Sequence, residues 1–316
     1  MPHWLIKTAI QHAISVLPYP QQWNRLFQKF GGTNSLDLGA GMFERRLEHT
    51  RTHLEHFLER QPQPPTAFTA LELGTGWFPT MAVGLYLCGA SDVWTIDIDP
   101  LLKRPQMRRM LALFFEYQAR NELQKHLPQL RADRFARLRE LAPLVEQESP
   151  EAFLERLNIH VMVRDAQKTG LPPNSVDLMF STGVLEYIPR PVLHGILAEF
   201  RRLCTPRAVM SHWISVIDQF SYFDRSITPF NYLRYTSKQW RYLNSPLIWQ
   251  NRLRISDYRK LLGEAGYEIT KELNTSGSPE DLQRFPLAPE FQGYSKADLL
   301  VLTSWLVARP RETAPL

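Results

Sequence analysis

Cysteine is scarce in this sequence, which has two, Cys88 and Cys204, among 316 residues. Both lie in apolar stretches with helical spacing, and together they supply neither a disulfide framework nor a cysteine-rich metal motif. We therefore expect a reducing compartment, and the predicted location is the cytoplasm.

Long apolar runs are also absent, and no stretch is long and apolar enough to span a membrane. The N-terminal stretch is apolar in part, but polar residues such as Lys7 and Ser15 interrupt it and exclude a signal-peptide core. Its apolar residues fall on one helical face. This pattern predicts a helix packed on its own domain, with weak contact of residues 4–17 with a membrane surface as the alternative.

Charge of one sign is not in large excess. The chain has 37 Lys and Arg residues and 32 Asp and Glu residues, which gives a net charge of +5. That balance does not by itself indicate a nucleic-acid partner. Hydrophobic residues make up 44% and charged residues 22%, as in globular proteins. The length allows one large core with attachments or two small domains.

Two stretches share an acid followed by Gly-x-Gly and two bulky apolar residues: LDLGAGMF at Leu36–Phe43 and LELGTGWF at Leu71–Phe78. A nucleotide-binding turn needs a buried strand before it, a helix after it and an acid about 20 residues further on. The second copy has all three, with Asp97 following Gly76 by 21 positions. A carboxylate there can accept both hydroxyls of a ribose.

The first copy does not have this context. The stretch FGGTNS before it is not a buried strand, a charged amphipathic helix follows it, and the Pro-rich linker Gln61–Thr66 stands where the second strand should be. We interpret Leu36–Phe43 as a loop entering a cap helix, from which it could touch a ligand from above. The cap helix carries His49, His53 and His56 at metal-ligand spacing, but we interpret them as a solvated face and expect no metal.

Apolar stretches alternate with helical ones along the rest of the chain, which favours a parallel sheet covered on both faces. Two segments exceed ordinary connections and are typical of lids or substrate walls. One is charged and helix-forming, at about 101–157, and the other is rich in aromatic residues, at about 218–254. We predict a cap and linker over 1–66, a main domain over 67–310 and a tail over 311–316. Strands are expected at 67–73, 92–99, 158–163, 176–181, 208–215, 268–270 and 298–308, and helices at 191–204 and 255–267.

The succession of motifs resembles the class I S-adenosylmethionine-dependent methyltransferases (methyltransferase type 11-like). The first motif is Glu72–Phe78, in which Phe78 replaces the family's third glycine, and Asp97 matches the acid after the second strand. The stretch RDAQKTGLP at Arg164–Pro172 matches the third motif. The fourth motif is STGVLEYI at Ser181–Ile188, with a tyrosine in place of the family's histidine. The resemblance covers roughly 67–308, less the two insertions.

The resemblance implies an α/β fold with a Rossmann-like, mostly parallel seven-stranded sheet and helices on both faces, plus an N-terminal helical cap and a helical insertion. It implies S-adenosyl-L-methionine as cofactor. The glycines would let the backbone approach its methionine half, and Glu72 would organise the turn and neutralise its amino group. Asp97 would bind the ribose, and Asp165 with the Ala166 amide would bind the adenine. The implied cofactor-binding residues are Glu72, Leu73, Gly74, Thr75, Gly76, Asp97, Ile98, Asp165, Ala166 and Ser181.

Methyl transfer is an in-line displacement that depends mainly on orientation, and a base helps when the acceptor is a hydroxyl. The candidate catalytic bases are His212 and Asp218, near the end of the fifth strand, and a buried structural histidine is the alternative for His212. We expect the acceptor pocket to be built by residues 1–60 together with Asp218–Asn251. Its aromatic residues either line that pocket or pack in a core: Tyr222, Tyr232, Tyr235, Trp240 and Trp249.

The acceptor is less well defined by the sequence. No Asn-Pro-Pro-Tyr or Asp-Pro-Pro-Tyr follows the fourth strand, which disfavours a nucleic-acid amine. A small-molecule, glycan or lipid-linked acceptor is left, with O-methylation slightly favoured. The alternatives are an NAD-dependent oxidoreductase, which should show glycine or alanine where Pro79 stands, and a non-catalytic Rossmann-fold binding protein, which would be expected to lose the loop or Asp97.

Overall fold

The computed structural model describes residues 3–15, 38–63, 65, 67–244 and 249–311. Part of the first glycine stretch, Leu36 and Asp37, lies outside the described residues, as do part of the linker and residues 312–316 of the expected tail. Within the described ranges, no helix combines the length and the apolar character needed to cross a membrane.

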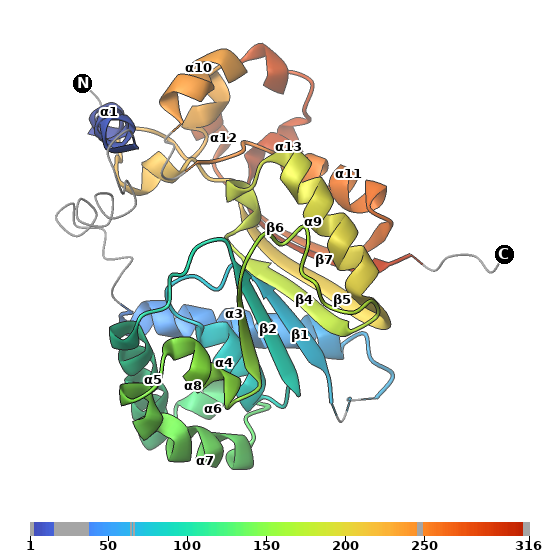
Figure 1. The fold of residues 1–316 in the computed structure, drawn as a ribbon. Coiled ribbons are helices and arrows are strands. Elements are labelled where there is room, and N and C mark those ends of the chain that lie inside the picture. The colour runs from blue at the N-terminus through green and yellow to red at the C-terminus, as the bar shows by residue number, and fades with distance from the viewer. Residues whose placement is uncertain (1–2, 16–37, 64, 66, 245–248, 312–316) are drawn as a thin grey trace.

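A seven-stranded sheet forms the centre of the molecule, in the order β3-β2-β1-β4-β5-β7-β6 (Figure 1). Strands β1 to β5 run parallel, and β7 pairs antiparallel with both β5 and β6. This confirms the Rossmann-like, mostly parallel sheet. The strands are β1 (Thr69–Leu73), β2 (Asp92–Asp97), β3 (Ile159–Val163), β4 (Val176–Thr182), β5 (Cys204–Ser215), β6 (Tyr267–Ser276) and β7 (Val301–Pro310).

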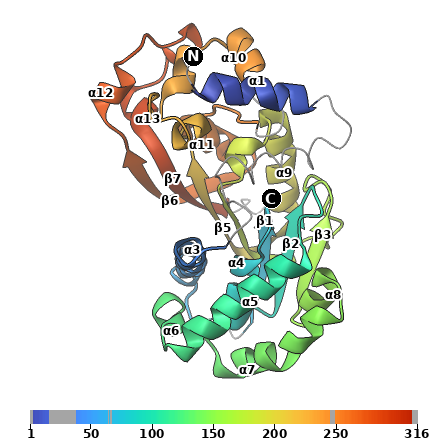
Figure 2. The same cartoon turned by 90° about the vertical axis from the view of Figure 1, so that its left-hand side faces the viewer.

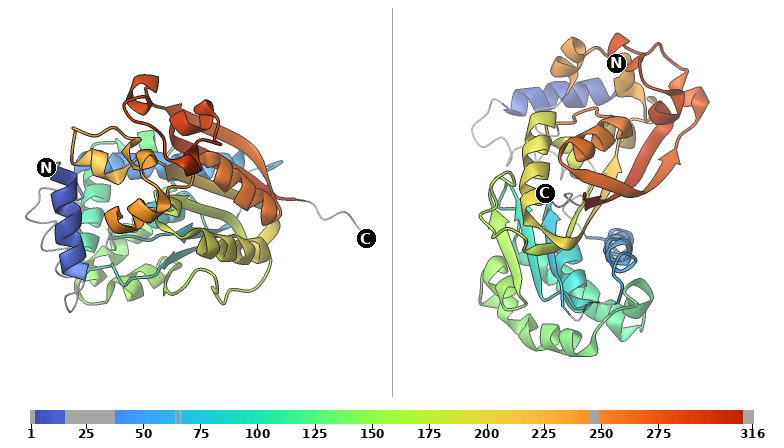
Figure 3. Two further views of the ribbon diagram at one scale, coloured as in Figure 1. Left: turned by 90° about the horizontal axis from the view of Figure 1, so that it is seen from above. Right: turned by 90° about the vertical axis from the view of Figure 1, so that its right-hand side faces the viewer.

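Helices cover both faces of the sheet because the strand residues alternate between two apolar clusters. In β4, Leu178 and Phe180 belong to the cluster under α3 (Ala40–Leu58), α4 (Thr80–Leu87) and α5 (Arg104–Ala119). Met179 belongs to the opposite cluster, under α9 (Arg190–Leu203) and α11 (Ile255–Glu264). Figure 2 shows α3 and α9 on opposite sides of the central strands, and the right-hand panel of Figure 3 views these layers from the other side.

The expected cap helix α3 lies against the sheet itself. Four of its apolar side chains, Phe43, Leu47, Leu54 and Phe57, are fully buried in the cluster that also contains strand residues. It begins immediately after Gly39, so Ala40–Phe43 form its first turn and only the residues before them belong to a loop. The second glycine of that stretch is therefore helical.

The N-terminal helix α1 (His3–Ser15) packs on its own chain, as the first of the two interpretations predicted. Trp4 is 2% exposed, its ring lies 5.3 Å from that of Phe220, and its amide donates to Asp224 over 3.1 Å. Figures 1 and 2 both place α1 beside α10 (Ser237–Leu243). The aromatic segment thus forms a third apolar cluster, which includes α12 (Pro279–Leu282) and α13 (Lys296–Leu300) from between β6 and β7.

The charged insertion is helical, as expected, and its helices gather at the lower end of Figure 1. It comprises α5, α6 (Leu123–His126), α7 (Ala132–Leu141), η1 (Ala142–Glu146) and α8 (Pro150–Glu155). Four further short 3-10 helices follow among the described residues: η2 (Leu185–Tyr187), η3 (Gln219–Tyr222), η4 (Asn231–Arg234) and η5 (Pro289–Phe291). The last expected strand begins later than expected, at Val301, because Ser295 caps α13 by accepting from the Asp298 amide.

Candidate functional site

A cavity of about 670 Å³ lies at the carboxyl ends of the central strands, where ligands bind in open α/β sheets. The glycine turn after β1, the end of β2 and the loop after β4 form one side of it. The first half of α3 and Trp213 of β5 form another. Its lining joins apolar side chains with the charged residues Arg45, Arg46, Asp97, Arg164 and Asp165.

The turn after β1 has a backbone that requires glycine. Gly74 has a φ of +89°, and a Cβ atom there would lie 2.5 Å from Cγ2 of Val184. Gly76 has a φ of +63°, and its amide donates a hydrogen bond of 2.9 Å to Oδ2 of Asp97. The turn is therefore tied to the end of β2, with its backbone against the cavity and no side chain in the way.

Glu72 lies beneath this turn and is fully buried. Its Oε2 accepts a hydrogen bond of 3.0 Å from the Thr95 hydroxyl, which lies 2.6 Å from the Thr75 hydroxyl. Oε1 has no hydrogen-bond partner among the described residues. Burial raises the pKa of Glu72 to about 8, against the lowering effects of Thr95 and the Arg46 charge.

The two acids after β2 and β3 line the cavity. Asp97 is half-buried, and burial raises its pKa even though backbone amides donate to it. Asp165 is exposed, and its Oδ1 accepts from the Gln167 amide over 2.9 Å. Ile98 lies at the rim and is 76% exposed. An acid at one strand end and an apolar side chain beside it are the groups that a nucleoside needs.

Seven of the ten residues named for the cofactor line this cavity: Leu73, Gly74, Gly76, Asp97, Ile98, Asp165 and Ala166. Glu72, Thr75 and Ser181 do not, and all three are buried. Ser181 instead pairs with Nδ1 of His212 over 2.7 Å, on the face of the sheet that carries α9. Its neighbour Thr182 lines the cavity, because successive strand residues point to opposite faces.

His212 and Asp218 do not reach the cavity, contrary to our expectation. The same alternation points Trp213 into the cavity and His212 away from it, into apolar surroundings that lower its pKa to about 4. Asp218 is fully buried at the start of η3, where it accepts from the Phe220 amide over 2.8 Å and from Asn231 Nδ2 over 3.1 Å. Burial raises its pKa to about 6. Their assignment as bases stays a prediction.

Four residues of α3 line the cavity and were not among the predicted cofactor-binding or catalytic residues: Met42, Arg45, Arg46 and His49. They follow one another at i, i+3, i+4 and i+7, the spacing of one helical face, which is the signal that could have found them. The interpretation of this face as solvated is wrong, since His53 and His56 are 0% and 2% exposed against the sheet. The described part of the chain contains no group of three or more His, Cys, Asp or Glu residues able to hold a metal.

The aromatic segment contributes no described residue to the cavity lining. Tyr232 and Trp240 are buried in the third apolar cluster, and Tyr222 is 62% exposed. Core packing, the alternative that the sequence left open, therefore accounts for the first two. Of the two segments expected to build the acceptor pocket, residues 1–60 contribute to the cavity lining through α3, and their role towards an acceptor stays a prediction.

The cavity fits the methyl donor that the sequence resemblance implies. The glycine turn offers a backbone cradle that a Cβ at Gly74 would fill, and carboxylates stand at two successive strand ends. The cationic side chain of Arg46 lies in the same wall. These groups match a ligand with ribose hydroxyls, an adenine and an amino-acid carboxylate.

Comparison with known proteins gives a sequence match to one family. The profile of the methyltransferase domain matches residues 133–211, which run from α7 into β5 and include Asp165 and Ser181. A comparison with proteins of curated function gave no significant match.

Solved structures align over most of the chain at low identity. A protein from Pyrococcus horikoshii OT3 aligns with a TM-score of 0.48 and 12% identity, over 92% of this chain and 99% of its own. Geranyl diphosphate methyltransferase in complex with SAM aligns with a TM-score of 0.44 and 12% identity, over 88% of this chain and 92% of its own. The cyclase SpnF aligns with a TM-score of 0.44 and 15% identity, over 83% of this chain and 81% of its own. These similarities, each with a TM-score below 0.5, identify neither a substrate nor an activity.

Three observations agree. The methyltransferase profile matches the sequence, the sheet has the expected mostly parallel seven-stranded form, and the glycine turn faces acids at the ends of the next two strands. When bound, S-adenosylmethionine supplies an electrophilic methyl group. The matched profile over residues 133–211, together with this fold and site, supports a class I S-adenosylmethionine-dependent methyltransferase.

Proposed function

We propose that this methyltransferase transfers its methyl group to a hydroxyl of a small-molecule, glycan or lipid-linked acceptor. The observation that carries the proposal is the cavity, whose volume of about 670 Å³ lies in the upper half of the range for ligand sites, about 300–1,000 Å³. One side of it has the nucleoside-binding groups, and α3 with β5 supplies a separate wall. A donor and a small acceptor can therefore meet inside it.

The donor half is assigned from the residues named by sequence. Asp97 binds the ribose hydroxyls, and Asp165 with the Ala166 amide binds the adenine. The backbone of Gly74 and Gly76 lies against the methionine half, while Leu73 and Ile98 supply apolar walls. Glu72 and Thr75 act from beneath by holding the turn, and Ser181 supports the neighbouring strand end.

Arg46 is the partner we assign to the methionine carboxylate. Its Nη1 donates to the Phe78 carbonyl over 3.2 Å, which places the guanidinium beside the first turn after β1. It lies close enough to Glu72 for the two charges to shift each other's pKa. Burial lowers the pKa of Arg46, so an incoming carboxylate would find a poorly hydrated cation, the setting in which such a pair is strong.

The acceptor half combines Arg45, His49 and Tyr187 with the ring of Trp213. Flat apolar surface beside a cation suits a partly polar acceptor that contains a ring or an acidic group. This composition supports a small acceptor more than a nucleic acid. We also keep the division into residues 1–66, 67–310 and 311–316 as a proposal, with α3 working as part of the main domain.

Calorimetric titration tests the donor half. S-adenosylhomocysteine should bind the parent, and Asp97→Ala should lose about tenfold or more for each charge-assisted contact worth about 1.5–3 kcal/mol. Arg46→Met should weaken S-adenosylhomocysteine and leave 5′-methylthioadenosine, which lacks the amino-acid group, within about twofold. Arg51→Met, on the same helix and paired with Glu55, is the matched control.

The alternatives predict other titrations. Binding of NAD in place of S-adenosylhomocysteine would identify an oxidoreductase, and binding of neither would favour a non-catalytic protein. Equal loss of both adenosine ligands in Arg46→Met would remove the carboxylate assignment and leave the cofactor unchanged.

A further inference from the structure

A continuous row of hydrogen bonds runs between α3 and the sheet. His49 Nδ1 lies 3.4 Å from the Thr182 hydroxyl, which lies 3.0 Å from His53 Nε2. His53 Nδ1 lies 2.8 Å from the Ser211 hydroxyl, which lies 2.9 Å from His56 Nδ1. Three imidazoles from one helix and two hydroxyls from neighbouring strands therefore alternate without a gap.

The row is enclosed by aromatic rings. The Trp305 ring lies 5.1 Å, 4.9 Å and 5.4 Å from the rings of His49, His53 and His56, and Phe180 lies 4.9 Å from His53. His53 is fully buried, and burial lowers its pKa well below the ordinary value. Protonation of His53 is therefore unfavourable. The histidines are therefore held neutral and in fixed orientations.

A neutral row of this kind can conduct a proton. A neutral imidazole donates at one nitrogen and accepts at the other, and a hydroxyl both donates and accepts. Only two arrangements place one hydrogen in every bond. In the first arrangement, His49 and His53 carry the proton on Nδ1 and His56 carries it on Nε2. In the second, His49 and His53 carry the proton on Nε2 and His56 carries it on Nδ1. A shift of one proton along every bond converts the first arrangement into the second.

The cavity end of the row is His49, which lines the cavity together with Arg45 and Arg46. Burial, followed by the positive charges of these two arginines, lowers the pKa of His49 to about 4. The same charges favour an unprotonated Nε2 at this end, because a lone pair is attracted to a cation and an N–H is repelled. They select the first arrangement.

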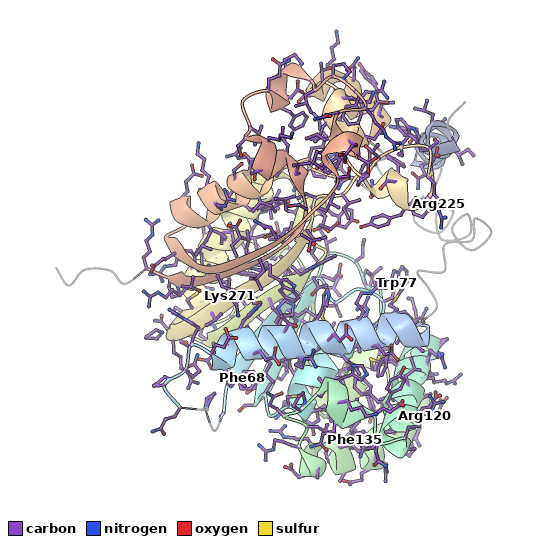
Figure 4. All side chains as sticks on the ribbon, turned by 180° about the vertical axis from the view of Figure 1, so that it is seen from behind. Phe68, Trp77, Arg120, Phe135, Arg225 and Lys271 are labelled. Carbon is purple, nitrogen blue, oxygen red and sulfur yellow. The ribbon has the colours of Figure 1, made fainter. Side chains whose placement is uncertain are left out.

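The other end is His56. Burial and the Lys271 charge lower its pKa to about 4, against the raising effect of Glu59. Nζ of Lys271 lies 2.9 Å from a Glu59 carboxylate oxygen, and Glu59 is exposed. Figure 4 shows Lys271 near one end of α3 and Trp77, from the glycine turn, near the other. The row therefore extends along α3 from the cavity towards the molecular surface.

We propose that His49 is the general base for the hydroxyl acceptor and that Thr182, His53, Ser211 and His56 carry the proton from it to solvent. The proposal rests on the O-methylation proposed above. The acceptor oxygen bonds to the methyl carbon, the carbon–sulfur bond breaks with its electron pair remaining on sulfur, and the hydroxyl proton moves to His49 Nε2. His49 passes its Nδ1 proton to Thr182, which passes its own hydroxyl proton to His53. His53 and Ser211 each pass one proton further in the same way, and His56 releases its Nε2 proton to water.

This arrangement solves a difficulty of an isolated His49. A base with so low a pKa would bind the acceptor's proton weakly and could not hold it beside two arginines. In the row, no imidazolium is formed at any position, because each group releases a proton as it receives one. His49 is the catalytic residue, and the other four are positioning residues that act through it.

Nitrogen NMR of protein labelled with ¹⁵N-histidine, in complex with S-adenosylhomocysteine at pH 7.5, tests the proposal. One-bond and long-range couplings show which ring nitrogen carries the proton, and single His→Asn variants assign the three rings. We expect Nδ1–H for His49 and His53 and Nε2–H for His56. In Thr182→Val, His49 should show a mixture of the two tautomers in place of one. Ser211→Ala should have the same effect on His56. Thr52→Val, a threonine of the same helix that donates to the Glu48 carbonyl, should change none.

Other tautomer patterns overturn the proposal. A proton on His49 Nε2, mixed forms in the parent, or signals unchanged in both the Thr182 and Ser211 variants would each show that the row does not operate as described. Calorimetry on the same samples separates the two proposals. If S-adenosylhomocysteine does not bind, the donor assignment is wrong. The histidine tautomers measured in the free protein then still test the proposed proton transfer along the row.

Discussion

The Thr95 hydroxyl donates a hydrogen bond of 3.0 Å to Glu72, directly beneath the glycine turn. The bond holds a fully buried carboxyl whose second oxygen has no partner among the described residues. Such a group favours its protonated form, and its pKa is raised to about 8. The turn that approaches the cavity therefore lies over a carboxyl that is protonated below that pH.

The pH dependence of stability follows from this shift. The unfolded pKa of Glu72 is the ordinary 4.5, and the folded value is about 8, so the native state binds the extra proton. The stabilisation is fully present below about pH 4.5 and is lost as the pH rises through about 8. Glu72→Gln, which resembles the neutral form, should flatten the fall in the free energy of unfolding between pH 5 and 9, measured by urea denaturation.

A part of that fall should persist in the variant, because the pKa of buried Glu186 is also raised to about 8. Glu268→Gln, at an exposed ion pair with Arg309, is the control and should keep the parent profile. Identical profiles for the parent and Glu72→Gln would show that Glu72 titrates normally.

The two glycine stretches should respond oppositely to alanine. At Gly74 a Cβ would lie 2.5 Å from Val184, and Gly74 and Gly76 both have positive φ, so their replacement should abolish binding of S-adenosylhomocysteine. A Cβ at Gly39 or Gly41 would meet no atom within 4 Å, and Gly41 lies inside α3. Their replacement should leave affinity within a few-fold, with Gly41→Ala gaining about 0.5–1 kcal/mol. A reversed result would reassign the donor to the first stretch.

His212 and Asp218 can be separated from the chemistry by single substitutions. Asp218→Asn should lower the free energy of unfolding by about 1–3 kcal/mol, because it weakens the bonds from the Phe220 amide and Asn231. His212→Asn should likewise destabilise, and both should bind S-adenosylhomocysteine as the parent does. Loss of turnover with unchanged stability in either variant would instead restore it as the catalytic base.

Arg254 should be the most costly single arginine to remove. It is fully buried and joins the aromatic segment to β5 and β7 by donating to several oxygens. These belong to Val216, Tyr232, Asp298, Leu299 and Val301. Arg254→Met leaves buried carbonyls without a donor and should cost about 3 kcal/mol or more in urea unfolding. Arg284→Met, at an exposed ion pair with Asp281, should stay within about 0.5 kcal/mol.

Much of the donor side could be predicted from sequence because its signals are local. A glycine turn, the strand before it and an acid at the end of the next strand are read from a few adjacent residues, and parallel strands bring their carboxyl ends to one edge. The alternation of apolar stretches likewise gave the sheet. The expected strand at 298–308 began too early, because the short helix α13 precedes β7 and both are apolar.

The wall proposed for the acceptor depends on contacts between distant segments. His49, Thr182 and Trp213 come from α3, β4 and β5, and no local pattern shows that α3 lies against those strands. Strand parity then decided which side chains enter the cavity, Thr182 and Trp213 rather than Ser181 and His212.

The sequence by itself determined the sheet, the glycine turn after β1 and the acids that face it, because backbone conformation and strand ends are set by neighbouring residues. Only the tertiary structure decided that three histidines of a charged helix are buried and joined through Thr182 and Ser211. The physical reason is that burial and hydrogen bonding of α3 arise from its packing on strands more than 100 positions further along the chain.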